Sequence, residues 1–598
     1  MAANGRLRRA AATRYGARMR RTASWAPWAL LLVLAGGSAC GDDDAAAPDA
    51  APAPDAMPPP PEHPGELAVT ATHYDVALDL DTRASTVTVT LRTTSDGNCV
   101  TLPMRPAAKS VAFDGTAARR FDVTDGALHA CDGRGFVAGT DVELAVSLDE
   151  PLATDGDMDV GYSVQSDAAG GRFTYLVSWV NGCDRHGPCD SRPDAFATYH
   201  FAVTHAAGTQ VLCAGVVTTP SPTLTECRFD AAGGPTYSTF GLMARAPAWT
   251  ESSLGAFGGV TAKLFDRPGS GLAARLDGAQ LGGELAWLED HFGVYPFGDE
   301  LRFVAAPTYW AGFEHPGNIA LGDWLATSTS AYADGVMHTA MHEVVHQWAG
   351  DHATLAGTYD FVWKEAMAEY LTFVYEDEHL AAGVSAKTLA YWKRASKGAK
   401  FFPVPQDQPR PLLATYYGDA YGPGPMVLFR QLEAMYGRDQ VLAALAALVG
   451  TGTPRTLAVA DVQAALELAT GADLTAYFDA WVYGAGKPAY PVVTATLEET
   501  APGSGAWRVR VAASSADGKA RGCAFHVRVL GPGGVAAGEV ADYAFSTGPD
   551  GGEYDTPPEQ ALAFLPDSAI IDPLGECLVF APAALVDDAL PERPAWRR

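Results

Sequence analysis

The sequence predicts a multidomain α+β protein, in which a mostly helical region is flanked by two β-rich regions. Three patterns predict this architecture. Apolar and polar residues alternate from Leu67 to about Ala244, apolar residues recur at helical spacing from about Gly271, and alternation returns from Ala489. With 598 residues, of which 48% are apolar, the chain is long enough for about three or four domains with separate cores.

The first β-rich region is predicted to span 66–250. Within it, residues 72–81 and 86–91 alternate with a period of two, which is typical of strands with one buried face. Gly, Asp and Pro residues separate such segments and favour turns. We therefore expect an N-terminal β-sheet domain.

The central region, predicted to span 251–488, carries the period of a helix. Apolar residues from Leu272 to Leu288 predict a helix that ends before Gly293. Further helices are predicted at 331–349, 360–378, 384–398, 424–436, 438–449, 459–470 and 474–484.

The last region, 489–598, returns to the alternation of strands. Residues 507–512 and 524–530 are the clearest examples. Two such segments separated by turn-forming residues predict a small C-terminal β-sandwich domain.

The chain is acidic, with a formal net charge of −28 at pH 7. Because such a surface repels phosphate groups, we expect no nucleic-acid partner.

The N-terminal 39 residues have the pattern of an export signal. Seven arginines between Arg6 and Arg21 precede an apolar run, 28–35, and small residues up to Ala39. A basic segment, an apolar segment too short to span a bilayer and a small-residue cleavage site together predict a signal peptide at 1–39. We therefore expect an exported protein.

Cys40 follows a Gly-Ser-Ala sequence that resembles a bacterial lipobox, with Gly37 where that pattern usually has Leu. The resemblance implies that Cys40 is lipidated and anchors the protein to a bacterial membrane, in the periplasm or at the cell surface. Secretion without a lipid is the alternative. Residues 40–65 are rich in Ala, Pro and Asp and predict a disordered linker.

The cysteine count agrees with export. Nine cysteines are present, and lipidation of Cys40 leaves eight, an even number. Eight cysteines allow many connectivities, and pairing nearest neighbours in the sequence predicts the disulfides Cys99–Cys131, Cys183–Cys189, Cys213–Cys227 and Cys523–Cys577.

The most specific motif is His342-Glu343-Val344-Val345-His346. Residues four apart lie on the same face of a helix, so the imidazoles of His342 and His346 can bind one metal ion. Glu343 lies close enough to reach a metal-bound water and to act as its general base.

A catalytic zinc ion usually has three protein ligands and one position open to water. The third ligand is predicted to be Glu365, which follows His346 after 18 intervening residues. That interval allows a loop and a return helix. We therefore predict one Zn²⁺ per chain, bound by His342, His346 and Glu365, and interpret Glu369, one helical turn further, as a residue that orients a histidine ligand.

This motif and this interval resemble the aminopeptidase N family of zinc gluzincin metallopeptidases. Residues 346–354 are similar to the stretch after the family's second histidine, although Asp351 stands where the family often has Asn. Lys364 and Ala366 replace the family's usual Asn and Gly on either side of the third ligand. The resemblance implies a thermolysin-like catalytic domain. The large C-terminal helical domain of many members is not expected here, because the residues after Pro488 have a β pattern.

Residues 311–317, Ala-Gly-Phe-Glu-His-Pro-Gly, resemble the exopeptidase segment of that family, usually Gly-Ala-Met-Glu-Asn. Glu314 is retained, whereas Phe313 and His315 replace Met and Asn. The resemblance implies that Glu314 binds the α-amine of the substrate and that Gly312 and Phe313 contact the substrate. The glutamine that the family often supplies from its N-terminal domain has no counterpart in 177–181.

Residues 419–424 resemble the family's Tyr-x-x-Gly segment, whose tyrosine stabilises the tetrahedral intermediate. The spacing to Gly424 favours Tyr421 for this role, with Tyr416 and Tyr417 as alternatives.

Together these residues predict a zinc-dependent aminopeptidase that hydrolyses the N-terminal residue from peptides. A zinc endopeptidase on the same scaffold is an alternative within the enzymes. A surface-anchored binding protein without activity is the alternative from another class, and it would have no need of Glu343, Glu365 and Tyr421.

Overall fold

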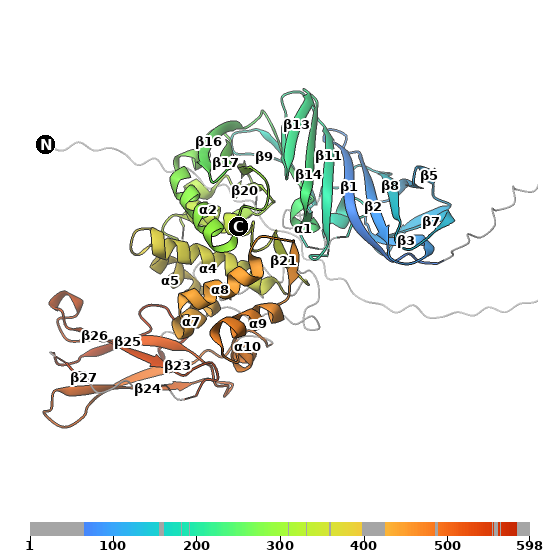
Figure 1. The fold of residues 1–598 in the computed structure, drawn as a ribbon. Coiled ribbons are helices and arrows are strands. Elements are labelled where there is room, and N and C mark those ends of the chain that lie inside the picture. Colours follow the sequence, from blue (N-terminus) through green and yellow to red (C-terminus); the bar gives the residue numbers. More distant parts are fainter. Residues whose placement is uncertain are drawn as a thin grey trace, which may run out of the picture. The chain divides into compact units, whose positions relative to one another are not determined.

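The structure is a computed structural model that describes residues 65–582, except 155–160, 181, 191, 309, 331, 358–359, 398–424, 485–487, 553, 555–559 and 563. The predicted signal peptide, Cys40 and nearly all of the linker lie outside the described residues, as do Tyr421, Tyr416 and Tyr417. In Figure 1 the described chain passes from blue and green strands through green, yellow and orange helices to red strands.

The first part of the chain is built of strands, as the alternation predicts. β1 (Val69–Asp79) pairs antiparallel with β2 (Ser85–Thr93) and parallel with β11 (Phe196–Thr204). Tyr74, Val76 and Leu78 on β1 are buried, and the residues between them are exposed, so one face of the sheet forms a core.

These strands belong to an eight-stranded sheet of order β13-β14-β11-β1-β2-β8-β4-β5. Its other members are β4 (Ala108–Phe113), β5 (Thr116–Ala117), β8 (Asp141–Leu148), β13 (Val216–Ser221) and β14 (Leu224–Pro235). A three-stranded sheet contains β3 (Gly97–Pro103), β7 (Ala127–Phe136) and β6 (Arg120–Thr124), and a four-stranded sheet contains β12 (Gln210–Cys213), β15 (Leu242–Ala246), β10 (Arg172–Val177) and β9 (Gly161–Ser166).

A five-stranded sheet of order β16-β17-β18-β20-β19 supports the central region. Its strands are β16 (Thr250–Phe257), β17 (Val260–Asp266), β18 (Glu300–Ala306), β20 (Asn318–Gly322) and β19 (Gly312–Phe313). β19 is the last strand in this order and pairs antiparallel with β20, with Gly312 opposite Leu321.

The first helix of this region is shorter than predicted. Residues Leu272–Ala274 form a single 3₁₀ turn, and α2 spans Gly278–Phe292. The reason is Asp277, whose Oδ1 accepts hydrogen bonds from the backbone N–H groups of Ala279 and Gln280 at 2.9 and 3.3 Å. This N-cap fixes the start of the helix.

The helix that carries the His-Glu-x-x-His motif is also shorter than predicted. α3 spans Gly335–Val345 rather than 331–349. Asp334 caps it, because its Oδ1 accepts from the N–H groups of Val336 and Met337 at 3.1 and 3.4 Å. His346 is the C-cap residue, after which the chain turns into the short strand β21 (Ala353–Leu355).

The other predicted helices are confirmed, with small shifts at their ends. They are α4 (Phe361–His379), α5 (Val384–Ser396), α7 (Pro425–Tyr436), α8 (Arg438–Val449), α9 (Val459–Thr470) and α10 (Thr475–Trp481). α4 packs against α3, and this contact between two helices places the residues of the site described below.

The C-terminal part forms two three-stranded sheets. One contains β23 (Val492–Glu499), β24 (Ala506–Ser514) and β27 (Gln560–Ala561), and the other contains β26 (Val540–Ser546), β25 (Ala524–Leu530) and β28 (Ser568–Ile571). They are joined to the helices by hydrogen bonds such as that from the Trp481 indole to the carbonyl oxygen of Gly522 at 3.0 Å.

All four predicted disulfides are confirmed. They are Cys99–Cys131, Cys183–Cys189, Cys213–Cys227 and Cys523–Cys577. Within the described part of the chain, no helix has the length and apolar character needed to cross a bilayer.

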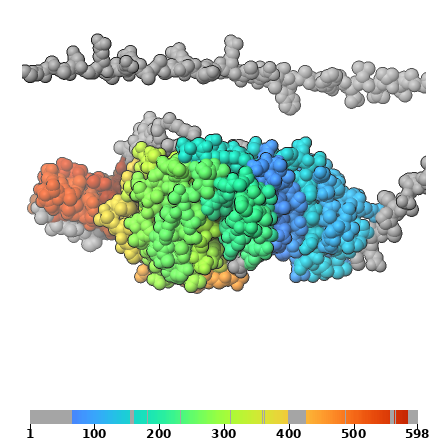
Figure 2. Space-filling model, turned by 90° about the horizontal axis from the view of Figure 1, so that it is seen from above, coloured from blue at the N-terminus to red at the C-terminus, as the bar shows by residue number. Residues whose placement is uncertain are grey.

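Residues of the first β-rich part contact the central region directly. Arg302 on β18 donates to the carbonyl oxygens of Cys213 and Gly215, both at 2.8 Å. The hydroxyl of Tyr237 in α1 (Thr236–Thr239) donates to the carbonyl oxygen of Gly350 at 2.9 Å. Figure 2 shows the molecule in space-filling form, with the colours following the sequence as in Figure 1.

The cap of the motif helix gives a test of this fold. Replacing Asp334→Ala removes the acceptor for two N–H groups and the ion pair with Arg275 at 2.8 Å. We expect the free energy of unfolding to fall by about 0.5–2 kcal/mol in urea titrations. Asp290→Ala, an exposed position on α2, is the control and is expected to change it by less than about 0.5 kcal/mol. Equal values for both variants would contradict the role of Asp334.

Candidate metal centre and active site

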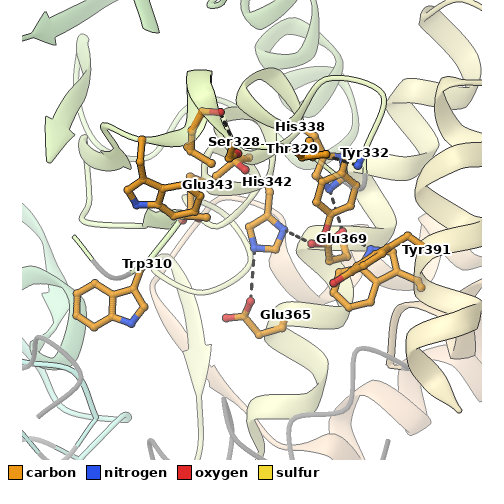
Figure 3. A pocket seen from close by; sticks show the side chains of 18 residues that line it. Trp310, Ser328, Thr329, Tyr332, His338, His342, Glu343, Glu365, Glu369 and Tyr391 are labelled. Carbon is orange, nitrogen blue, oxygen red and sulfur yellow. Dashed lines mark hydrogen bonds and ion pairs between the residues drawn. The ribbon is translucent and has the colours of Figure 1, made fainter. Parts of the chain in front are cut away.

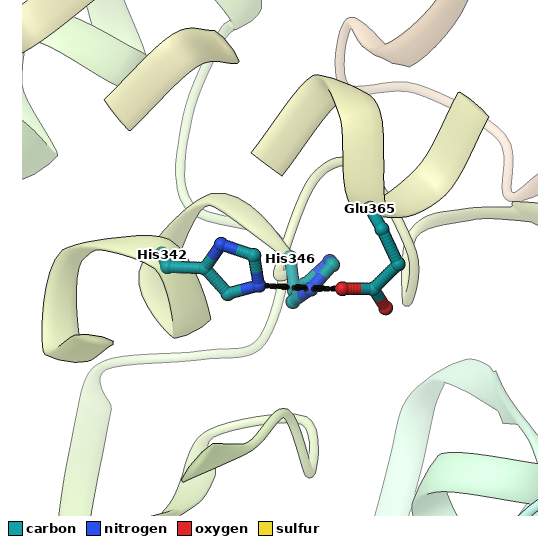
Figure 4. A group of neighbouring side chains, drawn as sticks. All are labelled: His342, His346 and Glu365. Atoms are coloured by element: carbon teal, nitrogen blue, oxygen red, sulfur yellow. Dashed lines mark hydrogen bonds and ion pairs between the residues drawn. The ribbon is translucent and has the colours of Figure 1, made fainter. Parts of the chain in front are cut away.

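Helices α3 and α4 bring together the three predicted metal ligands. The Nε2 atoms of His342 and His346 lie 3.0 Å apart. Glu365, in the first turns of α4, places its Oε2 at 3.4 Å from His342 Nε2 and 3.5 Å from His346 Nε2. Figure 4 shows the two rings and the carboxylate converging on one point.

The donor atoms fit a tetrahedral metal ion. With bonds of about 2.0–2.1 Å, two ligands of tetrahedral zinc lie about 3.3–3.4 Å apart, close to the three distances found here. The second nitrogen of each ring faces an acceptor, since His346 Nδ1 is 3.0 Å from the carbonyl oxygen of Ala349 and His342 Nδ1 is 3.2 Å from Glu369 Oε1. Both Nε2 lone pairs are therefore directed to the common point.

Glu369 links this centre to a second charged pair. Its Oε2 accepts from the Trp392 indole at 2.8 Å and lies 3.1 Å from His338 Nε2. The other nitrogen of His338 lies 2.7 Å from Glu376 Oε1. Burial lowers the pKa of His338, but the charges of Glu376 and Glu369 outweigh it and raise that pKa to about 9.

Glu369 is predicted from the sequence, whereas His338 and Glu376 are not. A signal was present, because His338 lies four residues before His342, as His342 lies four before His346. Residues at this spacing share one helix face. Glu376 lies seven residues after Glu369 and therefore also returns to the face of α4 that meets α3.

Glu343 lies against the last strand of the central sheet. It is 5% exposed and lines the same pocket as His342 and Glu365. Burial raises its pKa to about 8, and the charges of Glu314 and Glu365 act in the same direction. A side chain at Gly312 would place its Cβ at 2.2 Å from Glu343 Oε1, so the glycine makes room for this carboxylate.

The pocket in front of these residues has a volume of about 150 Å³. One part of its wall is polar, with His342, Glu343 and Glu365, and the remainder combines aromatic side chains with serine and threonine residues (Figure 3). The aromatic lining residues are Trp310, Trp324, Tyr332, Tyr391 and Trp392. Such a wall suits an apolar group held beside a polar reaction centre.

Glu314, in the loop between β19 and β20, does not lie open to this pocket. It is 4% exposed, and its Oε1 lies 2.8 Å from the Nζ atom of Lys364. Lys364 Nζ also lies 2.7 Å from Glu365 Oε1. In the sequence Lys364 is only the neighbour of the third ligand, and its contact with Glu314 becomes visible in the structure.

Gln347 ties the Glu314 loop to the motif helix. Its side-chain oxygen accepts from the N–H group of Gly317 at 2.8 Å and from the hydroxyl of Tyr295 at 3.2 Å. Its Nε2 donates to Asp351 Oδ2 at 3.2 Å. The loop therefore has a fixed position relative to α3.

Two departures from the family pattern have a physical explanation. Asp351 is fully buried, and burial together with the charge of Glu314 raises its pKa well above the ordinary value. The neutral acid that this favours has the shape of Asn, the residue common at this position. His315 turns toward α1, where its Nδ1 contacts the carbonyl oxygen of Ser238.

Phe313 packs in an aromatic group beside the pocket. Its ring centroid lies 5.1 Å from that of Trp310 and 5.7 Å from that of Trp179. Tyr421, predicted to stabilise the oxyanion, belongs to the residues outside the described part of the chain.

Comparisons with known proteins agree with this geometry. Residues 280–481 match the peptidase family M1 domain. An aminopeptidase N from Streptomyces lividans is 26% identical over 218 residues, which are 33% of this chain and 25% of that protein. The chain therefore spans about a quarter of the length of that relative.

Solved structures share the fold. An M1 zinc metallopeptidase from Deinococcus radiodurans has a TM-score of 0.57 and 20% identity, covering 70% of this chain and 94% of that one. A mutant of that metallopeptidase bound to a Tyr-Ser-Ala substrate gives a TM-score of 0.56 and 19% identity, covering 68% and 92%. Residues 280–481 therefore form a peptidase family M1 domain, and the aligned part of the chain is similar to an aminopeptidase N.

Proposed function

We propose that the protein is a zinc-dependent aminopeptidase with one Zn²⁺ per chain, which removes the N-terminal residue from peptides. The observation that carries the proposal is the convergence of His342, His346 and Glu365 on one point beside Glu343. Three ligands with a neighbouring carboxylate are the requirements for activating a water molecule.

Each residue of the site has a separate role in the proposed reaction. Zinc, when bound, supplies a Lewis acid that lowers the pKa of a water molecule to about 7. Glu343 accepts a proton from the attacking water and passes it to the leaving amine. Glu369 orients His342 through its Nδ1 atom. Tyr421 donates a hydrogen bond to the developing oxyanion.

The substrate lies between the sheet edge and the pocket. β19 is the last strand of its sheet, so the backbone of Gly312 and Phe313 is available to an extended peptide. Glu314 provides the negative charge that a substrate α-ammonium group needs. The aromatic wall accepts an apolar side chain of the peptide.

The proposal includes the organisation of the whole chain. We infer an N-terminal β-sheet domain at 66–250, a thermolysin-like catalytic domain at 251–488 and a C-terminal β-sandwich at 489–598. The grouping of the strands into separate sheets supports this division. We further propose that a lipid on Cys40 anchors the protein to a bacterial membrane, in the periplasm or at the cell surface.

A second candidate, a zinc endopeptidase, is favoured by one observation: the carboxylate of Glu314 already pairs with Lys364. An endopeptidase does not need a free α-ammonium group on its substrate. A binding protein without activity is less well supported, because it would not require Glu343 beside the three ligands.

A panel of fluorogenic aminoacyl amides, assayed with and without a chelator, tests the proposed function. We expect hydrolysis that is lost on chelation and restored by zinc. Acetylated peptides of the same sequence separate the two peptidases, because an aminopeptidase loses the ammonium group that it binds. Hydrolysis that survives chelation would contradict the proposal.

Substitutions of the motif should separate metal binding from turnover. Glu343→Gln removes the general base and keeps the ligands, so zinc content should remain while kcat falls by about 10²–10⁴. His342→Ala removes a ligand and should lose the zinc. Metal analysis of the purified variants, together with their kcat, is the measurement. A Glu343→Gln enzyme with normal kcat would exclude Glu343 as the base.

Gly312→Ala tests the fit between β19 and the catalytic carboxylate. The added Cβ would lie 2.2 Å from Glu343 Oε1, and the carboxylate at the end of this flexible side chain must move away. A misplaced catalytic group can cost about 10² in rate, so we expect a fall of that size in kcat. Zinc content and Tm should stay at wild-type values. A lower Tm with unchanged kcat would contradict this role of Gly312.

A further inference from the structure

Lys364 is a fully buried cation at the metal centre. It belongs to the first turns of α4, directly before Glu365, and its side chain is 0% exposed. Its Nζ atom lies 2.8 Å from Glu314 Oε1 and 2.7 Å from Glu365 Oε1. The two carboxylate oxygens of Glu365 therefore have different partners: Oε2 faces the histidines and Oε1 faces Lys364.

The surrounding residues hold this ammonium group in place. Lys364 Nζ lies 5.7 Å from the ring centroid of Trp179, a distance at which a cation is attracted to the ring. Trp179 has φ +25°, an uncommon conformation for a residue with a side chain. A Cβ at Gly350 would lie 3.0 Å from Lys364 Cε, so this glycine leaves space for the lysine stem.

The position of the lysine has a consequence for the substrate. The buried ammonium group of Lys364, paired with Glu314, has the same charge and hydrogen-bond donors as the α-ammonium group of a peptide. Among the described residues, the pocket lining includes Glu343 and Glu365 but stops short of Glu314 and Lys364. Because Lys364 already pairs with Glu314 Oε1, a peptide ammonium group that binds Glu314 shares the carboxylate with a cation that repels it.

We propose that Lys364 is an internal counterpart of the substrate's α-ammonium group and determines how well the site distinguishes free from acylated N-termini. With the lysine in place this distinction is weaker than Glu314 alone would give, and removal of its charge strengthens it. The inference rests on the proposed peptidase function and specifies the substrate class of that same site.

The test uses the zinc-loaded full chain and two probes, the tripeptide Ala-Phe-Ala amide and its N-acetyl form. Binding of each probe is measured by calorimetry in a Glu343→Gln background, and kcat/KM is measured with Glu343 intact. Lys364→Gln keeps the length and an amide donor but removes the charge. We expect it to raise the preference for the free N-terminus by at least about tenfold in both measurements. An unchanged preference would overturn the inference.

Two matched variants show whether the effect acts through Glu314. Lys364→Arg keeps a cation and should keep the wild-type preference. In the double variant Glu314→Gln with Lys364→Gln, the gain should disappear, because the carboxylate that becomes available is absent. A gain that persists without Glu314 would overturn the inference.

A third variant does not depend on the stability of Lys364→Gln. If Lys364 weakens the contact of Glu314 with the substrate, the single substitution Glu314→Gln should lower the preference by less than about tenfold. A loss of about tenfold or more would show that Glu314 binds the substrate ammonium unhindered and would overturn the inference. Metal analysis of every variant confirms equal zinc content. If the wild-type enzyme hydrolyses neither probe, the proposed function fails, while calorimetry still decides the role of Lys364.

Discussion

Buried carboxylates have to be paired with cations or become neutral, and this constraint governs the region around α3 and α4. Glu314, Glu365 and Glu369 are each less than one-tenth exposed. An uncompensated buried charge costs several kcal/mol, and nearby cations keep the pKa of each of these three carboxylates below its ordinary value. Lys364 lies between Glu314 and Glu365, and His338 faces Glu369. A metal ion at the histidines adds charge to the same network, so metal binding and side-chain placement depend on each other.

The close approach of the elements depends on two glycines. Gly312 lets β19 lie against the carboxylate of Glu343, and Gly350, with φ +153°, lets the chain turn beside His346 and Lys364. In both places a Cβ would meet a functional side chain rather than empty space. The sequence marks these positions only as glycines in loops or short strands. Only the packing of α3, α4 and β19 in the structure shows which side chains these glycines make room for.

Local spacing rules predicted the part of the site that lies within one helix turn. His342 and His346 share a face of α3 by periodicity alone, and the interval to Glu365 was long enough for a return helix.

The predicted disulfides are also present in the structure, because strands close in sequence often pair. Cys99 lies directly opposite Cys131 on β3 and β7. Helix ends were less predictable, because side-chain caps such as Asp334 decide them. The pairing of Lys364 with Glu314 depends on a contact across 50 positions of sequence, which no local pattern contains.

The first β-rich part of the chain also contributes to the electrostatics of the centre. Trp179 covers the ammonium group of Lys364, and the hydroxyl of Ser238 donates to Asp351 at 2.7 Å. Without these residues Lys364 and Asp351 would gain access to water, which would weaken the ion pair of the lysine and favour ionisation of the acid. A second negative charge beside Glu314 would in turn draw Lys364 away from Glu365. The stability of the contacts on α4 therefore depends on residues more than a hundred positions earlier in the chain.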